Sequence, residues 1–128
     1  MTESGESKTG KVFRIRDLAG ICVCIAALLA VASARQKSVT VDEYASVPNG
    51  LAILKTGAFH IDNQATPLSK VLTALPLLGT SAKFSTTGVP AYTTSWQCGN
   101  QFAAENAENY QAYFFAPRIV AILFLLLT

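Results

Sequence analysis

Charged residues are scarce in this chain, making up 14% of its 128 residues against roughly 25% in average soluble domains. Hydrophobic residues reach 51% and the mean hydropathy is +0.35, so the chain lacks the low hydrophobicity and high charge of an intrinsically disordered protein. The net charge is only +2, with Lys and Arg thinly spread, so an extensive nucleic-acid-binding surface has no support. The length allows one small domain, whereas the composition is typical of a membrane protein.

Motifs of soluble enzymes are also missing. The sequence contains no G-x-S-x-G nucleophile elbow, no phosphate-binding glycine loop and no N-x-Ser/Thr glycosylation site. His60 is the only histidine, and without a second histidine or a nearby cysteine it has no zinc-ligand spacing. Cys22 and Cys24 lie in an apolar run and Cys98 is alone in the remainder, so no intrachain disulfide is expected. Nothing therefore supports a soluble hydrolase or a nucleotide-binding enzyme.

Residues 18–34 form the first of two apolar runs and carry no charge between Asp17 and Arg35. The run meets the lower limit of about 17 residues for a membrane-spanning helix, and its many small residues favour close packing against other helices. Basic residues concentrate in front of it, which predicts a flexible cytoplasmic tail over residues 1–17 and an extracytoplasmic location after Arg35. These basic residues are Lys8, Lys11, Arg14 and Arg16.

A cleaved signal peptide is the alternative interpretation of the same run. The basic residues would form its n-region, and Ala32-Ser33-Ala34 fits the A-x-A cleavage pattern before Arg35. In that case the chain is a small exported or membrane-anchored protein without catalytic activity. Both interpretations place the N-terminus in the cytoplasm before processing.

The second apolar run covers residues 119–127. It is about half the length that a membrane-spanning helix needs, which predicts that residues 118–128 are the truncated start of a second spanning helix. A glycolipid-anchor signal also ends in an apolar tail, but it requires a longer tail after a polar spacer, and Arg118 is badly placed for it. A small membrane protein that assists a larger complex by helix packing is a further hypothesis.

Residues 35–117, the segment between the two apolar runs, are predicted to form a mainly α-helical extracytoplasmic loop. Apolar residues recur at helical spacing over residues 42–54. Thr40 is the predicted N-cap, with Glu43 completing a capping box, and Gly57 is the predicted stop. Pro48 predicts a kink or short break, because proline removes a backbone donor and clashes one turn back.

The remaining loop elements follow from periodicity and turn residues. Residues 68–78 predict a short amphipathic helix that lies in the membrane interface. Residues 59–67 and 79–95 are predicted loops, the second because it is rich in Thr, Ser, Gly and Pro. Residues 102–115 predict a helix that continues into the final apolar run, where Pro117 near the start is tolerated.

Several stretches follow one another in a fixed order between the two apolar runs: Asp42-Glu43-Tyr44-Ala45, Gly50 to Phe59, Pro67-Leu68-Ser69-Lys70, Leu72 to Leu78, Trp96, Gly99, Phe102, Glu105-Asn106 and Ala116-Pro117-Arg118. In this order they resemble the first extracytoplasmic loop of GT-C membrane glycosyltransferases. The chain is most similar to bacterial relatives of the protein O-mannosyltransferases and aminoarabinose transferases, of the glycosyltransferase family 39 type. It departs from their pattern at Ser46, where many have His, and at Ala65-Thr66, where His-Pro is usual. The resemblance covers residues 18–128.

The resemblance implies transfer of a sugar from a polyprenyl-phosphate donor to a protein, lipid or glycan acceptor at the inner or plasma membrane. Asp42 is then the catalytic base, or the ligand of a divalent cation, and Glu43 supports it. Lys70 and Arg118 would bind the donor phosphate. Helix capping by Asp42-Glu43 and snorkelling by the two cations are the structural alternatives. The expected partners are the lipid bilayer, the donor and an unidentified acceptor, with no nucleic acid, and residues 1–128 alone are expected to be inactive.

Overall fold

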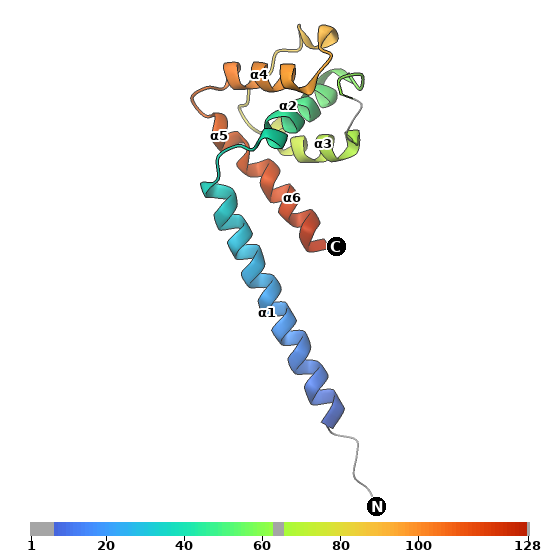
Figure 1. Ribbon diagram of the computed structural model, residues 1–128, viewed down its shortest axis with the longest axis vertical. Coiled ribbons are helices and arrows are strands. Elements are labelled where there is room, and N and C mark those ends of the chain that lie inside the picture. The colour runs from blue at the N-terminus through green and yellow to red at the C-terminus, as the bar shows by residue number, and fades with distance from the viewer. Residues whose placement is uncertain (1–6, 63–65, 128) are drawn as a thin grey trace, which may run out of the picture.

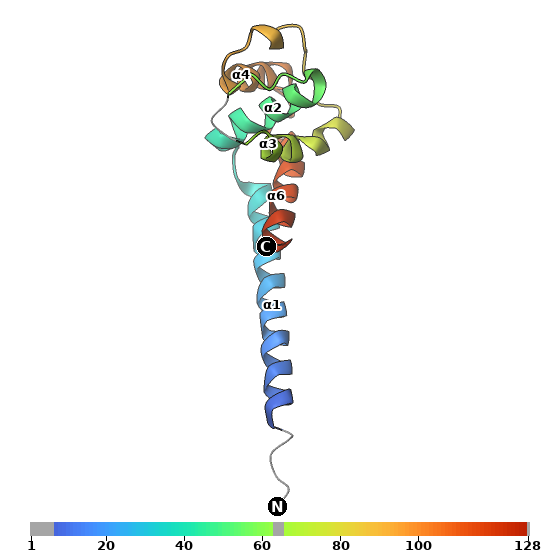
Figure 2. The ribbon, with the colours of Figure 1, turned by 90° about the vertical axis from the view of Figure 1, so that its right-hand side faces the viewer.

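The computed structural model describes residues 7–62 and 66–127, with side chains from Arg14 onward, and every regular element within them is helical. A long helix, α1, leads into a cluster of short helices, and α6 runs back from that cluster beside the C-terminal part of α1 (Figures 1 and 2). We call the cluster, formed by residues 41–62 and 66–114, the head. The elements are α1 (Ser7–Gln36), α2 (Val41–Thr56), α3 (Pro67–Ala74), the 3-10 helices η1 (Leu75–Gly79) and η2 (Val89–Ala91), α4 (Ser95–Glu105), α5 (Tyr110–Tyr113) and α6 (Phe115–Leu127).

Two stretches, Arg14–Gln36 and Tyr110–Leu127, are long and apolar enough to cross a membrane. Large apolar side chains along the first point away from the rest of the protein, as Leu28 does with 71% of its surface exposed. The helix that contains this stretch begins at Ser7, so residues 7–17 of the predicted tail are helical. Extending an existing helix costs little once its first turn has formed, and Lys and Arg are good helix formers. Residues 1–6 of the expected tail lie outside the described residues.

The predicted start and stop of α2 are confirmed. The Thr40 hydroxyl accepts a hydrogen bond from the Glu43 backbone N–H at 3.3 Å, and the Glu43 carboxylate accepts one from the Thr40 N–H at 3.0 Å. This reciprocal pair satisfies two amides that have no partner within the helix. At the other end Gly57 adopts a left-handed conformation with φ of 70° and donates to the Ile53 carbonyl. A glycine is suited to this position because it has no Cβ to clash.

The predicted break at Pro48 is wrong, since α2 continues through it. Proline cannot donate a hydrogen bond to the carbonyl of Tyr44, one turn earlier. That carbonyl faces α4 at Gly99, where an added Cβ would come within 2.6 Å of the Tyr44 oxygen. Pro48 itself is fully buried, so tertiary packing on both sides holds the helix in place despite the missing bond.

Close helix contacts through glycine organise the head around α2. In both views α2 lies between α3 and α4 (Figures 1 and 2). Gly99 lets α4 approach, and Gly50 does the same for α3, because a Cβ on Gly50 would lie 2.0 Å from the Lys70 carbonyl oxygen. Leu51 and Phe102 fill the core between these helices and are almost fully buried.

The helix predicted over residues 102–115 is wrong, because the chain turns between α4 and α5. Asn106 is buried and its side-chain amide bonds both the N–H and the carbonyl of Lys83 at 2.8 Å. It also donates to the Phe102 carbonyl. The turn brings Phe114 back onto Phe102, with ring centroids 5.8 Å apart in an edge-to-face arrangement that aromatic pairs favour.

The helix predicted over residues 68–78 is confirmed as α3 followed directly by η1. The loop predicted over residues 59–67 is irregular where it is described, and residues 63–65 lie outside the described part. In the second predicted loop, residues 79–95, the short η2 lies between the end of η1 at Gly79 and the start of α4 at Ser95.

Replacing Gly50 with alanine tests the α2–α3 contact. An alanine inside a helix ordinarily stabilises it by roughly 0.5–1 kcal/mol relative to glycine. Here the overlap with the Lys70 carbonyl should reverse the sign and lower the free energy of unfolding by about 1–3 kcal/mol. Gly79→Ala is the matched control, because a Cβ there meets nothing within 4 Å. Denaturant unfolding in detergent, followed by circular dichroism, gives both values. Equal stability of the two variants would contradict the tight contact.

Candidate functional site

The most connected polar group of the protein lies where α1 ends, α2 begins and α6 starts. The Arg118 guanidinium grips Glu43 with two bonds of 2.7 Å, one from Nε and one from Nη2. Its other N–H groups reach the carbonyls of Ala34, Lys37 and Ser38 at 2.7, 2.8 and 2.9 Å. All five guanidinium donors therefore have acceptors, and the side chain is only 11% exposed. We call this arrangement the Arg118 clamp.

Glu43 belongs to both the Arg118 clamp and the capping box of α2. Its carboxylate pairs with Arg118 and also accepts the backbone N–H of Thr40 in the capping box. Burial raises the pKa of Glu43, but the hydrogen bonds from Arg118 and Thr40 and the charge of Arg118 outweigh it, so the pKa lies below its ordinary value. Glu43 is thus held as a carboxylate with its lone pairs engaged. It is better suited to position its neighbours than to accept a proton.

Asp42 shares the first turn of α2 with Glu43 but has a different environment. Its side chain is exposed, and no ion pair involves it among the described residues. An exposed carboxylate next to the clamp is open to an approaching hydroxyl group or cation. No group of three or more His, Cys, Asp or Glu side chains gathers in the part of the chain that is described. A cation on Asp42 would therefore need further ligands from water or from a substrate phosphate.

Lys70 belongs to a second ion pair, in another part of the head. It is only 3% exposed, and its ammonium group donates to the Asp62 carboxylate at 2.8 Å. A longer contact of 3.4 Å reaches the Asp62 carbonyl. The carbonyl of Ile61, next to Asp62 in sequence, accepts a hydrogen bond of 3.2 Å from the buried side chain of Asn49. Lys70 and Asn49 thus both attach the chain after α2 to the helices.

The four residues predicted from sequence thus separate into two groups. Glu43 and Arg118 meet at the clamp, and Asp42 precedes Glu43 in the first turn of α2 without contacting Arg118, whereas Lys70 takes part in a different ion pair. Phosphate binding by Arg118 and Lys70 stays a prediction. In both cases a phosphate would have to replace acceptors that the cation already has, because Asp62 holds Lys70 and Glu43 holds Arg118.

Lys37 is a cation at the clamp that the sequence analysis missed. It borders two hollows beside Arg118, of about 160 and 330 Å³. The smaller hollow also includes Arg35, whose guanidinium carbon lies 5.2 Å from the centre of the Phe115 ring. The position of Lys37 just after the first apolar run was the available signal, since basic side chains there lie at the membrane boundary.

Aromatic side chains support the clamp from the side of the head. Tyr44 follows Glu43 and packs against Tyr110 and Trp96, with ring centroids 6.4 and 5.7 Å away. Its hydroxyl bonds the side chain of Asn100 on α4. These contacts fix the first turn of α2, and with it Asp42, against α4 and α5.

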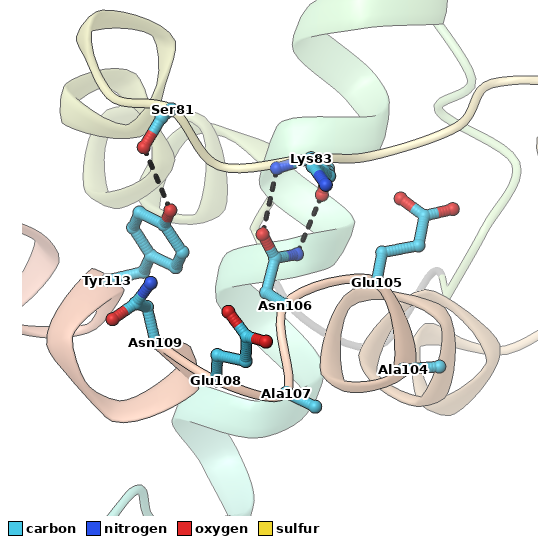
Figure 3. Close-up of a pocket in the computed structure, with 9 residues that line it drawn as sticks. All are labelled: Ser81, Lys83, Ala104, Glu105, Asn106, Ala107, Glu108, Asn109 and Tyr113. Carbon is cyan, nitrogen blue, oxygen red and sulfur yellow. Dashed lines mark hydrogen bonds between the residues drawn. The ribbon is translucent and has the colours of Figure 1, made fainter.

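A third hollow, of about 310 Å³, lies under the turn between α4 and α5 and shares no lining residue with the clamp (Figure 3). Its walls are fixed by the Asn106–Lys83 bonds and by a 3.0 Å bond between the hydroxyls of Ser81 and Tyr113. The Glu108 side chain extends between Asn109 and Asn106 in this view. The hollow is polar, but its lining residues include none from the two apolar helices α1 and α6, which meet at the clamp.

Comparison with known proteins adds no family to this geometry: no family model, no curated protein and no solved structure matches the chain. Its function is therefore inferred from its own residues and from the resemblance to GT-C glycosyltransferases.

Glu43→Gln tests the clamp through the pH dependence of stability. Because the pKa of Glu43 is lower in the folded state than in the unfolded state, its contribution is complete above its ordinary range and is lost as the pH falls through the folded value. Near neutral pH the variant should lose about 2 kcal/mol of unfolding free energy, as expected for charge-assisted hydrogen bonds. Below the folded pKa the difference from the natural chain should shrink.

Unfolding in detergent between pH 7 and pH 3 measures this difference. Glu108→Gln is the control, since this carboxylate is exposed and outside the clamp. A pH-independent deficit in Glu43→Gln, or the same profile in both variants, would show that the ion pair does not stabilise the fold.

Proposed function

We propose that this chain is the opening part of an integral-membrane glycosyltransferase that moves a sugar from a polyprenyl-phosphate donor to an acceptor hydroxyl. One observation carries the proposal: the exposed carboxylate of Asp42 stands beside the Arg118 clamp, where both apolar helices meet the head. The lipid tail of such a donor lies in the bilayer and its phosphate lies at the surface. A carboxylate that takes the proton of the acceptor must therefore also lie at the membrane surface. The resemblance to GT-C glycosyltransferases supports the same role.

The membrane location is supported by the surface of the protein as well as by hydropathy. On α3 and η1 a charged side chain is buried and apolar side chains are exposed, the reverse of the usual pattern. Lys70 points inward, whereas Leu68, Leu75 and Leu78 are 67, 48 and 52% exposed. In water such an apolar face is unfavourable, at roughly 25 cal/mol per Å². In both ribbon views α3 lies at the base of the head, next to the beginning of α6 (Figures 1 and 2). A bilayer crossed by α1 and α6 would meet this face, with the N-terminus cytoplasmic and the head outside.

In the proposed reaction Asp42 takes the proton of the acceptor hydroxyl as its oxygen attacks the anomeric carbon. The bond from that carbon to the donor phosphate breaks, and the phosphate leaves with the electron pair. Glu43 acts through Arg118, since their bonds hold the first turn of α2 that carries Asp42. Arg118 would stabilise the leaving phosphate if the phosphate replaced one of its present acceptors. Asp42 is also the residue that would hold a divalent cation.

The cleaved-signal alternative is disfavoured by one contact. The Ala34 carbonyl, at the predicted cleavage point, is part of α1 and accepts a hydrogen bond from Arg118 at 2.7 Å. Cleavage there would remove the helix to which the clamp attaches α6. The N-terminus of the protein isolated from membranes separates the two hypotheses, because a mature chain that begins at Arg35 would exclude the spanning role of α1.

Tryptophan quenching tests the predicted contact of α3 and η1 with the bilayer. In a Trp96→Phe background, Leu75→Trp should place the only indole of the chain at the membrane surface, where brominated lipids quench its fluorescence. The unaltered chain is the control, because Trp96 lies on α4, on the opposite side of α2 from α3 (Figure 1). Equal quenching of the two tryptophans in proteoliposomes would contradict the membrane orientation.

Asp42→Asn tests the catalytic assignment. Loss of a general base should lower the rate of sugar transfer by about 10²–10⁴-fold and leave membrane insertion intact. The assay measures the transfer of a labelled sugar from a polyprenyl-phosphate donor. It uses membranes that contain the longer protein of which this chain is proposed to be the opening part. Glu108→Gln should retain full activity. Undiminished transfer by Asp42→Asn would remove this carboxylate from the mechanism, and the tryptophan experiment would still report independently on membrane topology.

A further inference from the structure

A groove between α1 and α6 has the two parts that an amphiphile requires. Ala30, Ala121 and Ile122 line it on the side of the apolar helices, while Lys37 and Thr40 line it near the head. Its volume is about 330 Å³, and both ribbon views show the two helices running side by side in opposite directions at this level (Figures 1 and 2). We call it the α1–α6 groove.

The charge at the head end of the groove is positive. Arg118 is neutralised by Glu43, but Lys37 is exposed and has no ion-pair partner among the described residues. Arg35 lies in the adjoining hollow, over the Phe115 ring. Three cationic side chains therefore accompany a single lining carboxylate at this boundary, so an anionic group would be attracted to Lys37.

We propose that the groove binds an anionic phospholipid of the outer leaflet. One acyl chain lies against Ala30, Ala121 and Ile122, and the lipid phosphate interacts with the Lys37 ammonium group. The positive charge at the head end favours an anionic lipid over an apolar helix as the occupant, because the lipid supplies a phosphate next to Lys37. This proposal rests on the membrane placement of α1 and α6 but does not depend on sugar transfer.

Native mass spectrometry of the protein released from nanodiscs tests the proposal. The nanodiscs contain equal amounts of phosphatidylglycerol, which is anionic, and phosphatidylcholine, which has no net charge. The natural chain should retain phosphatidylglycerol preferentially. In Lys37→Gln this preference should fall about fivefold, the contribution of one basic side chain at an anionic surface. Lys55→Gln is the matched control, because Lys55 is also exposed but ends α2 in the head.

A second variant keeps the test decisive if Lys37 also affects folding. Ala121 is exposed, so Ala121→Trp should leave the fold intact while filling the groove, and retention of both lipids should fall. Equal retention of the two lipids by the natural chain, or an unchanged preference in Lys37→Gln, would overturn the proposal. Displacement by free phosphate would also overturn it, because the acyl chain would then contribute nothing. Stoichiometric displacement by polyprenyl phosphate would reassign the groove to the sugar donor, again against the phospholipid.

Discussion

The structure depends on the single guanidinium group of Arg118. The last carbonyls of a helix have no partners within it, and here that of Ala34 is satisfied by Arg118, a residue more than 80 positions later. The carbonyls of Lys37 and Ser38, just after the helix, bond the same guanidinium group. The same side chain pairs with Glu43 in the first turn of α2. A positive charge is also favourable at the C-terminal end of the α1 dipole. One residue thereby joins the end of the first apolar helix, the entry into the head and the beginning of the last helix.

This constraint explains why two adjacent carboxylates differ in chemistry. Glu43 faces Arg118 and the Thr40 amide, which keep it ionised and occupied. Asp42, one residue earlier, points elsewhere on the helix and remains exposed. The clamp thus binds Glu43 and leaves the neighbouring Asp42 carboxylate exposed. The same division between held and exposed groups recurs among the cations, since Lys70 is locked to Asp62 while Lys37 stays available at the mouth of the groove.

Local signals predicted most elements of the fold but few of the long-range contacts. Thr40, Glu43 and Gly57 marked the ends of α2 correctly, because capping involves residues within one turn. Pro48 and the α4–α5 turn were misjudged for a common reason. Contacts with distant segments, at Gly99 and at Lys83, outweighed the local preference in each case. At the candidate site, the acidic pair and Arg118 could be selected from sequence, and the position of Lys37 after the first apolar run was a signal that was missed. The pairing of Lys70 with Asp62 had no local signal.

The sequence by itself determined the two apolar runs, the helical character of the segment between them and the capping of α2. These features depend on composition and on spacing along one chain, which hydropathy and capping rules describe. Only the tertiary structure decided that Arg118 binds Glu43, that Lys70 turns inward while neighbouring leucines turn outward, and that α1 and α6 enclose a groove. Such outcomes depend on which distant groups meet, because the strength of an ion pair and the burial of a side chain are set by their surroundings in space.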